Sequence, residues 1–116
     1  MIVGIGLDLI ELYRIEKSVQ KSNRLVTRIL TQKERNVFEE LTSTRRQVEF
    51  LAGRFAVKEA YSKALGSGIG KTVAFKDIRC LNDSHGKPSI ADDARAHVSI
   101  SHAEEYAVAM VVLETQ

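Results

Sequence analysis

Two carboxylates stand in stretches that are otherwise apolar. Asp8 lies in the middle of the run IVGIGLDLIEL at residues 2–12, and Glu59 lies within the mostly apolar residues 45–66. A carboxylate inside an apolar element must be paired, hydrogen-bonded or bound to a metal, because burying a bare charge is too costly. Two simpler interpretations stay open. Asp8 could cap a following helix, and Glu59 could form a solvated salt bridge with Lys63.

Several cations accompany these carboxylates. Arg54 and Lys58 are four residues apart, and such a like-charge pair destabilises an isolated helix by about 0.2–0.5 kcal/mol, which an anion would relieve. Lys63 and His102 are further cations. Mg²⁺ usually takes one or two protein carboxylates and completes its octahedron with waters and substrate oxygens. The set therefore suits Mg²⁺ holding a pyrophosphate.

Other site chemistries fit the sequence less well. His97 and His102 have no cysteine or third histidine at zinc-ligand spacing. Neither Ser99 nor Ser101 sits on the sharp turn that a nucleophilic serine needs. The run GSGIGKT at residues 66–72 has Leu65 where the phosphate-loop pattern requires glycine, and it follows a predicted helix instead of a strand. We interpret its glycines as a helix end and a turn.

The carboxylates and cations depend on one long element. Residues 45–66, RRQVEFLAGRFAVKEAYSKALG, are predicted to form a single helix. Thr44 with Gln47 three residues on indicates a capping box at its start, and Gly66 suits the left-handed conformation that ends helices. The helix is apolar nearly all round, so we expect it to be buried between two layers.

The remaining elements predict an α+β fold, with this long central helix packed on a mainly antiparallel sheet. Gly4 and Gly6 indicate close neighbours for the strand at residues 2–12. Thr31 with Glu34 marks a short helix through about Leu41. Strands are expected at residues 73–81, 89–90, 97–102 and 106–114, with a short turn at residues 103–105.

Residues 13–36 are strongly basic, and five cations recur there at three- and four-residue steps. They could line one face of a helix or of a helix pair, either as a solvated face or as a docking surface for an acidic partner. No aromatics are interleaved among them, which favours a protein over a nucleic acid. These residues are Arg14, Lys17, Lys21, Arg24 and Arg28.

Composition restricts the chain to one domain, residues 1–116, with a modest core. The net charge of +2 does not by itself indicate nucleic acid, and Cys80 is the single cysteine. A reducing cytoplasm is the simplest setting for it. The apolar N-terminal run contains Asp8 and has no basic region before it, so it predicts neither a signal peptide nor a membrane span.

Four motifs together resemble one family: GIGLDLIEL, FLAGRFAVKEAYSKALGSGIG, HGKP and HVSISH. This pattern closely resembles the holo-[acyl-carrier-protein] synthases, the short homotrimeric branch of the phosphopantetheinyl transferases. The resemblance implies that 4′-phosphopantetheine is transferred from coenzyme A to a serine of acyl carrier protein, releasing adenosine 3′,5′-bisphosphate. The activity belongs to fatty acid biosynthesis.

The resemblance also implies roles for individual residues. Asp8 and Glu59 are the expected Mg²⁺ ligands, Lys63 is expected to neutralise the pyrophosphate, and Glu59 is our hypothesis for the base that takes the serine proton through a water. Arg14, Arg24 and Arg28 resemble the carrier-protein docking face. The expected coenzyme A contacts are Arg45, Arg46, Arg54, Lys58, Ser62, Lys63, Pro88 and His102.

Helix geometry adds an expectation about assembly. Arg45 and Glu59 are separated by about 21 Å along one helix, whereas the 3′-phosphate and pyrophosphate of coenzyme A are much closer together. Arg54 is closer to Glu59 and could share its site. Arg45 and Arg46 should therefore come from a neighbouring subunit, which fits a closed ring. The alternative is a binding module that uses its basic region without turnover or metal.

Overall fold

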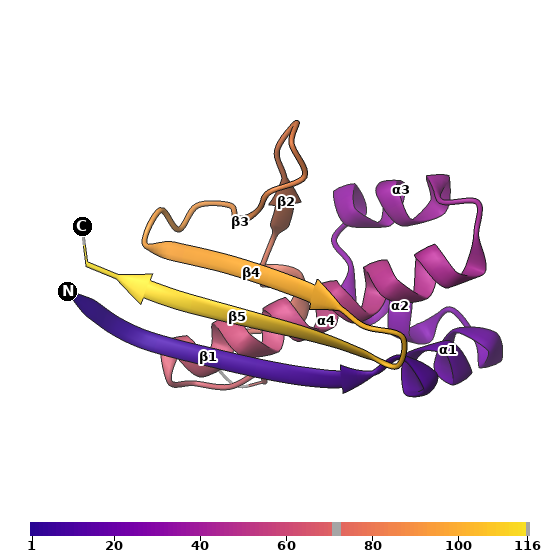
Figure 1. The fold of residues 1–116 in the computed structure, drawn as a ribbon, viewed down its shortest axis with the longest axis horizontal. Coiled ribbons are helices and arrows are strands. Elements are labelled where there is room, and N and C mark those ends of the chain that lie inside the picture. The colour runs from indigo at the N-terminus through magenta and orange to yellow at the C-terminus, as the bar shows by residue number, and fades with distance from the viewer. Residues whose placement is uncertain (71–72, 116) are drawn as a thin grey trace.

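A single long helix, α4 (Thr44–Leu65), crosses one face of a three-stranded antiparallel sheet (Figure 1). The structure is a computed structural model and describes residues 1–70 and 73–115. The predicted α+β class is confirmed. The other helices are α1 (Leu12–Lys21), α2 (Arg24–Ile29), α3 (Gln32–Glu40) and the short 3₁₀ helix η1 (Phe75–Asp77). The strands are β1 (Ile2–Glu11), β2 (Cys80–Asn82), β3 (Pro88–Ile90), β4 (Ala96–His102) and β5 (Tyr106–Glu114).

The three long strands have the order β1-β5-β4, while β2 and β3 form a separate hairpin. The register pairs Asp8 with Ala109 and Leu7 with Met110. Both chain ends lie at the same end of the sheet (Figure 1), where the Thr115 N–H donates to the Met1 carbonyl. The first strand therefore joins the C-terminal hairpin, as the sequence predicts.

Glycines allow β1 to lie directly against the backbone of α4. A Cβ atom added at Gly4 would collide with the carbonyl of Ala64, and one added at Gly6 would collide with the carbonyl of Ala60. Only glycine fits at such distances. The same face of β1 carries Asp8 two residues further on, so this contact brings Asp8 to the C-terminal half of α4.

The prediction that α4 is buried between two layers is confirmed. Its first half packs with α1 and α2, and its second half packs with the sheet and with the segment around β2 and β3. The first cluster includes Leu12, Ile15, Val26, Ile29, Val48 and Leu51. The second includes Ala56, Val57, Ala60, Ile78, Val111 and Leu113.

The ends of α4 were predicted with one error. Ser43, not Thr44, caps the helix, because its hydroxyl accepts the N–H of Arg46. Gln47 instead donates from its side chain to the Phe38 carbonyl. The end at Gly66 is confirmed, with a left-handed φ of 87°.

The strand predicted at residues 73–81 is wrong over most of its length. Asp77 accepts the N–H of Ala74 and closes the turn η1, while Phe75 turns inward and stacks on Phe55 at 5.4 Å between ring centroids. Within residues 73–81, only Cys80 and Leu81 belong to a strand, β2. The end of the glycine run, Lys71 and Thr72, lies outside the described residues.

The basic region is divided between two helices, α1 and α2, which is the helix pair that the spacing of its cations allows. The capping box of Thr31 and Glu34 at the start of α3 is confirmed. The N-cap of α1 is Glu11, without a side-chain bond, so the interpretation of Asp8 as a helix cap is wrong. Within residues 1–70 and 73–115, no helix has the length and apolar character needed to span a membrane.

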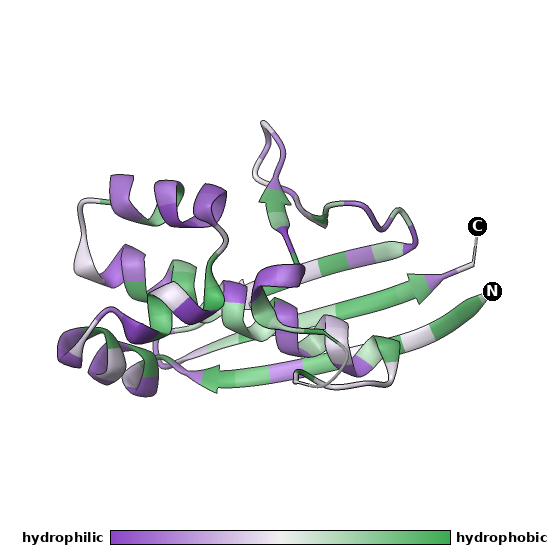
Figure 2. Ribbon diagram, turned by 180° about the vertical axis from the view of Figure 1, so that it is seen from behind, coloured by the Kyte–Doolittle hydropathy of each residue, from purple (hydrophilic) through white to green (hydrophobic). Residues whose placement is uncertain are grey.

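Figure 2 shows mainly green, hydrophobic residues along β1 and β5, whereas hydrophilic residues alternate with hydrophobic ones along β4. One face of the sheet is covered by α4. The other face remains open in a single chain and exposes large apolar side chains of neighbouring strands. These are Ile5, Leu7 and Leu9 of β1 and Met110 of β5.

Candidate active site

Asp8, Glu59 and Lys63 form a carboxylate cluster where β1 crosses α4. Nζ of Lys63 lies 3.2 Å from Oδ1 of Asp8 and 3.0 Å from the Leu7 carbonyl oxygen. The interpretation of Glu59 and Lys63 as a simple salt bridge is therefore wrong, because Lys63 pairs with Asp8. The predicted metal ligands are brought to one place.

The second oxygen of Asp8, Oδ2, is buried and has no hydrogen-bond partner among the described residues. A buried carboxylate oxygen without a donor is costly, and a bound cation would compensate it. No group of three or more histidine, cysteine or acidic side chains gathers anywhere in the described residues. A pair of carboxylates fits Mg²⁺, which keeps several waters, better than metals that need a complete protein cage.

Glu59 is also poised to interact with a cation. Burial raises the pKa of its carboxyl, and the neighbouring charge of Asp8 raises this pKa further. The charges of Lys63 and Arg28 act in the opposite direction. The charge of Asp8 therefore disfavours the charged form of Glu59, and a divalent cation between the two carboxylates would offset this repulsion.

Ser62 is buried beside this cluster. Its hydroxyl donates to the backbone carbonyl of Glu59 at 2.7 Å. In this arrangement the hydroxyl satisfies the helix and is not directed to solvent.

A second group of predicted residues lines a cavity of about 200 Å³ between α4, the β2–β3 hairpin and the end of β4. We call it the basic cavity. It brings together four of the expected coenzyme A contacts, three of which can be cationic. Its lining includes Arg46, Arg54, Pro88 and His102, with Glu49, Phe50, Gly53, Asn82, Gly86 and Ile100.

Arg54 is fixed in the basic cavity by two neighbours. Its Nη2 donates to Oδ1 of Asn82 at 2.7 Å, and its guanidinium lies 4.5 Å from the ring centroid of Phe50. The residue is 6% exposed, and its Nε is buried without a partner among the described residues. A buried guanidinium with a free N–H is suited to an anion.

His102 and the paired arginines complete this region. Nε2 of His102 lies 3.0 Å from the Glu49 carbonyl oxygen, and Gly53 leaves room for the imidazole. The Glu49 carboxylate accepts from both Arg45 and Arg46. Arg45 does not line the basic cavity, because its guanidinium also donates to the carbonyls of Ala103 and Glu104.

Lys58 lies in neither group. Its side chain is fully buried, and its Nζ lies 2.6 Å from Oε1 of Glu34 and 2.6 Å from the Ile29 carbonyl oxygen. Burial lowers the pKa of Lys58, while the Glu34 carboxylate opposes that effect. The Lys58 ammonium, which was expected to contact coenzyme A, thus already donates its hydrogen bonds to protein oxygens.

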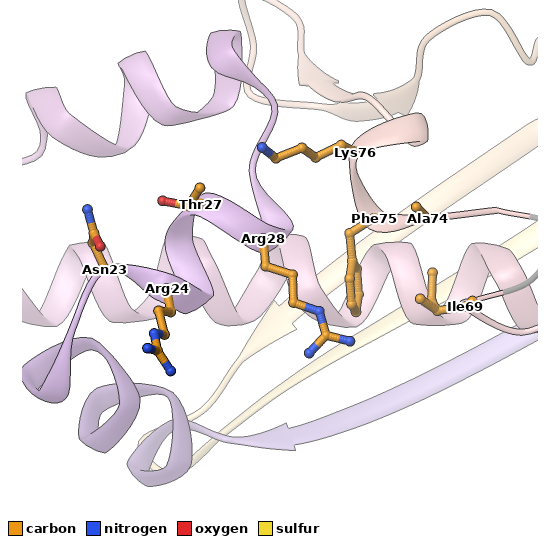
Figure 3. A pocket seen from close by; sticks show the side chains of 9 residues that line it. Asn23, Arg24, Thr27, Arg28, Ile69, Ala74, Phe75 and Lys76 are labelled. Carbon is orange, nitrogen blue, oxygen red and sulfur yellow. The ribbon is translucent and has the colours of Figure 1, made fainter.

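The predicted docking residues lie on two surfaces. Arg14 is exposed on α1 beside Lys17 and Lys21. Arg24 and Arg28 extend from α2 into a hollow of about 580 Å³, whose opposite wall is formed by Phe75 and Lys76 (Figure 3). The Arg28 guanidinium lies 5.6 Å from the centroid of the Phe75 ring. Arg28 lines this hollow, and its charge lowers the pKa of Glu59.

Sequence reasoning missed Glu34, Glu49 and Asn82. Glu34 was interpreted only as a capping residue, and Glu49 and Asn82 carry no motif of their own. Gly53 offered one signal, because a glycine inside a helix often marks a close approach by another group. No comparable signal pairs Glu34 with Lys58.

The two groups lie far apart along α4. Arg46 and Glu59 are separated by about 20 Å of helix axis at 1.5 Å per residue. Arg54 is about 7.5 Å from Glu59 along the axis and by sequence could share its site, but it is rotated by about 140° from Glu59 and lines the basic cavity with Arg46. One chain therefore holds an acidic half-site and a basic half-site at separate positions.

Comparisons with known proteins show which family the chain belongs to. A family model described as "4'-phosphopantetheinyl transferase superfamily" matches residues 4–111. A holo-[acyl-carrier-protein] synthase of Geobacillus sp. (strain WCH70) is 54% identical over 117 residues, which cover 98% of each chain. The synthase of Staphylococcus haemolyticus is 58% identical, again over 98% of each chain.

Solved structures give the same result. A holo-(acyl-carrier-protein) synthase from Bacillus anthracis, in complex with CoA (3′,5′-ADP), aligns with a TM-score of 0.89 and 56% identity over 100% of this chain and 99% of that one. The Helicobacter pylori synthase in complex with coenzyme A aligns with a TM-score of 0.80 and 32% identity over 95% and 99%.

The chain belongs to the 4′-phosphopantetheinyl transferase superfamily. It is an enzyme, a transferase, and the resemblance to the holo-[acyl-carrier-protein] synthases predicted from its motifs is confirmed.

Proposed function

We propose that this chain transfers 4′-phosphopantetheine from coenzyme A to a serine hydroxyl of apo acyl carrier protein and releases adenosine 3′,5′-bisphosphate. The observation that carries the proposal is the pairing of a carboxylate cluster, suited to Mg²⁺, with a separate basic cavity suited to a phosphate. Such a pair matches a ligand that has a pyrophosphate at one place and a 3′-phosphate at another. The product would supply fatty acid biosynthesis with loaded carrier protein.

Asp8 and Glu59 would hold Mg²⁺, and the unpartnered Oδ2 of Asp8 supports this assignment. When bound, Mg²⁺ supplies charge neutralisation for the pyrophosphate. Lys63, which is half exposed and already directed at Asp8, would add a second positive charge on the leaving side. Glu59 is the candidate base for the serine proton, because the raised pKa of its carboxyl makes it a better proton acceptor than an ordinary glutamate.

The basic cavity would hold the 3′-phosphate of coenzyme A through Arg46, Arg54 and His102, with Pro88 beside the adenine. The buried and unpartnered Nε of Arg54 supports this role. Arg45 would support the cavity from outside by holding Glu49. Lys58 and Ser62 would support the site from beneath the ligand without contacting it. The polar atoms of both side chains already donate to protein oxygens.

We further propose that each complete site forms between two chains of a homotrimer. Two observations support a shared site. The basic half-site lies on a different side of α4 from the acidic one, because Arg54, about 7.5 Å from Glu59 along the axis, is rotated from it by about 140° and Arg46 lies about 20 Å away. In addition, the outer sheet face exposes Leu7 and Leu9 at 57% and 61%, and an apolar face of this kind is typical of a subunit interface.

The acyl carrier protein would dock on α1 and α2. Arg14 on α1, with Arg24 and Arg28 on α2, presents positive charge next to the carboxylate cluster, which suits an acidic partner. Arg28 lines the hollow between α2 and η1, and its charge acts on Glu59. A cytoplasmic location stays a prediction, supported by the single buried cysteine.

The decisive experiment is a transfer assay with coenzyme A, apo acyl carrier protein and Mg²⁺, in which mass spectrometry measures the mass added to the carrier. We expect stoichiometric modification of one serine, loss of activity in EDTA, and recovery with excess Mg²⁺. Binding of the carrier without modification would favour the alternative of a non-enzymatic binding module.

A further inference from the structure

The buried ion pair between Glu34 of α3 and Lys58 of α4 lies outside both half-sites. Their side chains are 1% and 0% exposed. A buried pair is not in itself a strong source of stability, because the cost of desolvating two charges offsets most of their attraction. Its position in the fold is therefore more informative than its strength.

Glu34 joins three parts of the chain. Its Oε1 accepts from Lys58 and from the N–H of Thr31 at 2.8 Å, and its Oε2 accepts the N–H of Cys80 at 2.8 Å. Lys58 also donates to the Ile29 carbonyl at the end of α2. One carboxylate thus fixes the start of α3 and the strand β2 against α4.

A second connection between the same two elements lies next to the first. Arg54 is one turn before Lys58 on α4, and Asn82 is two residues after Cys80 on β2. The bond from Arg54 to Asn82 lines the basic cavity, whereas the connection through Glu34 is sealed from solvent. The buried connection therefore sets the distance at which the exposed one can form.

We propose that Glu34 and Lys58 are positioning residues for the basic cavity. They hold β2 against α4, so that Asn82 and Arg54 keep the geometry that receives the 3′-phosphate of coenzyme A. The proposal rests on the proposed function. It gives Lys58 a role through Glu34 and β2, not a direct contact with the ligand.

The test compares coenzyme A with 3′-dephospho-coenzyme A, which lacks only the phosphate in question. We expect Lys58→Met and Glu34→Gln each to raise the KM for coenzyme A about tenfold, the effect of losing a hydrogen bond to a charged group. The KM values for dephospho-coenzyme A and for carrier protein should stay within about twofold of wild type. Calorimetry should show the same loss for adenosine 3′,5′-bisphosphate, without any turnover.

Three further variants separate positioning from stability. Glu39→Gln removes an exposed carboxylate from the same helix, α3, and should leave all constants unchanged. The double variant Glu34→Leu/Lys58→Met replaces the pair with apolar side chains and should recover thermal stability. Its KM for coenzyme A should remain high, because the Cys80 N–H has lost its acceptor. If the pair variants do not fold, Asn82→Ala must produce the same selective loss.

Several outcomes would overturn the inference. Loss of discrimination in Lys58→Met but not in Glu34→Gln would mean that Lys58 contacts the phosphate directly. Equal increases in the KM for coenzyme A and for dephospho-coenzyme A would mean that the pair only stabilises the fold. A normal KM for coenzyme A in the apolar double variant would mean the same. A wild-type protein that modifies carrier protein with neither nucleotide would contradict the proposed function itself, and the inference would fall with it.

Discussion

Asp8 lies close enough to Glu59, where β1 crosses α4, for its charge to raise the pKa of Glu59. We expect Asp8→Asn and Glu59→Gln to abolish transfer while keeping the fold, because both substitutions preserve shape and remove only charge. The metal-free Glu59→Gln protein should be at least as stable as wild type at neutral pH, since it lacks the repulsion. Mg²⁺ should raise the Tm of wild type and of neither variant. Near-native turnover by either variant would show that the substituted residue is not a metal ligand.

Asp93 allows a prediction about pH. Hydrogen bonds from Arg95, and from Tyr61 at 2.5 Å, hold the pKa of Asp93 at about 2, below its usual 3.8. Because the folded protein favours the charged form, this stabilisation is present above pH 3.8 and disappears as the pH falls toward 2. Asp93→Asn should lower the Tm by about 5 °C at pH 7, and the difference should shrink between pH 4 and pH 2.

The neighbouring Asp92→Asn serves as the control, since Asp92 is exposed and asparagine tolerates its positive φ of 67°. A Tm difference for Asp93→Asn that stayed constant down to pH 2 would show that its carboxylate charge is not the cause.

At this scale, sequence reasoning predicted which residues carry charge but not always what they contact. Asp8 and Lys63 form an ion pair, as their opposite charges suggest, because β1 packs against α4. The partner of Lys58 could not be predicted, since Glu34 comes from another helix and its side chain also closes a capping box. Helical periodicity gives the side of α4 on which a residue lies, not the element that packs there.

Among the elements, α1 carries the clearest docking prediction. Arg14→Glu should raise the KM for carrier protein at least tenfold and change the KM for coenzyme A less than twofold, because only the acidic partner contacts this surface. Added salt should weaken carrier binding by wild type more than by the variant. Arg79→Glu makes the same charge change away from α1 and should have little effect. Equal changes for both substrates would exclude Arg14 from the docking surface.

Periodicity predicted the elements well where it was long and sustained. The helix α4 and the strands β1, β4 and β5 lie within one residue of their predicted ends. The segment before β2 was wrong because a local contact, Asp77 to the Ala74 N–H, closes a turn that no alternation pattern reveals. The cap of α4 was wrong because Ser43 and Thr44 are adjacent and chemically equivalent as caps.

For the whole molecule, the prediction concerns the two half-sites. An inactive Glu59→Ala protein, mixed and reassembled with an inactive Arg45→Ala/Arg46→Ala protein, should regain activity. At equal amounts, about a quarter of the interfaces in a closed ring would unite two native half-sites. Each parent reassembled alone is the control. An active monomer in sedimentation, or mixtures as inactive as their parents, would contradict a shared site.

Because both half-sites lie on α4, this helix also limits which insertions and deletions the sequence can accept during evolution. A residue inserted in α4 between Arg46 and Glu59 would move one half-site by 1.5 Å and rotate it by about 100° relative to the other. The β2–β3 turn and the segment between β3 and β4 face no such limit, since neither sets that separation. We therefore expect related sequences to vary in length in these connections and to keep the same number of residues in α4.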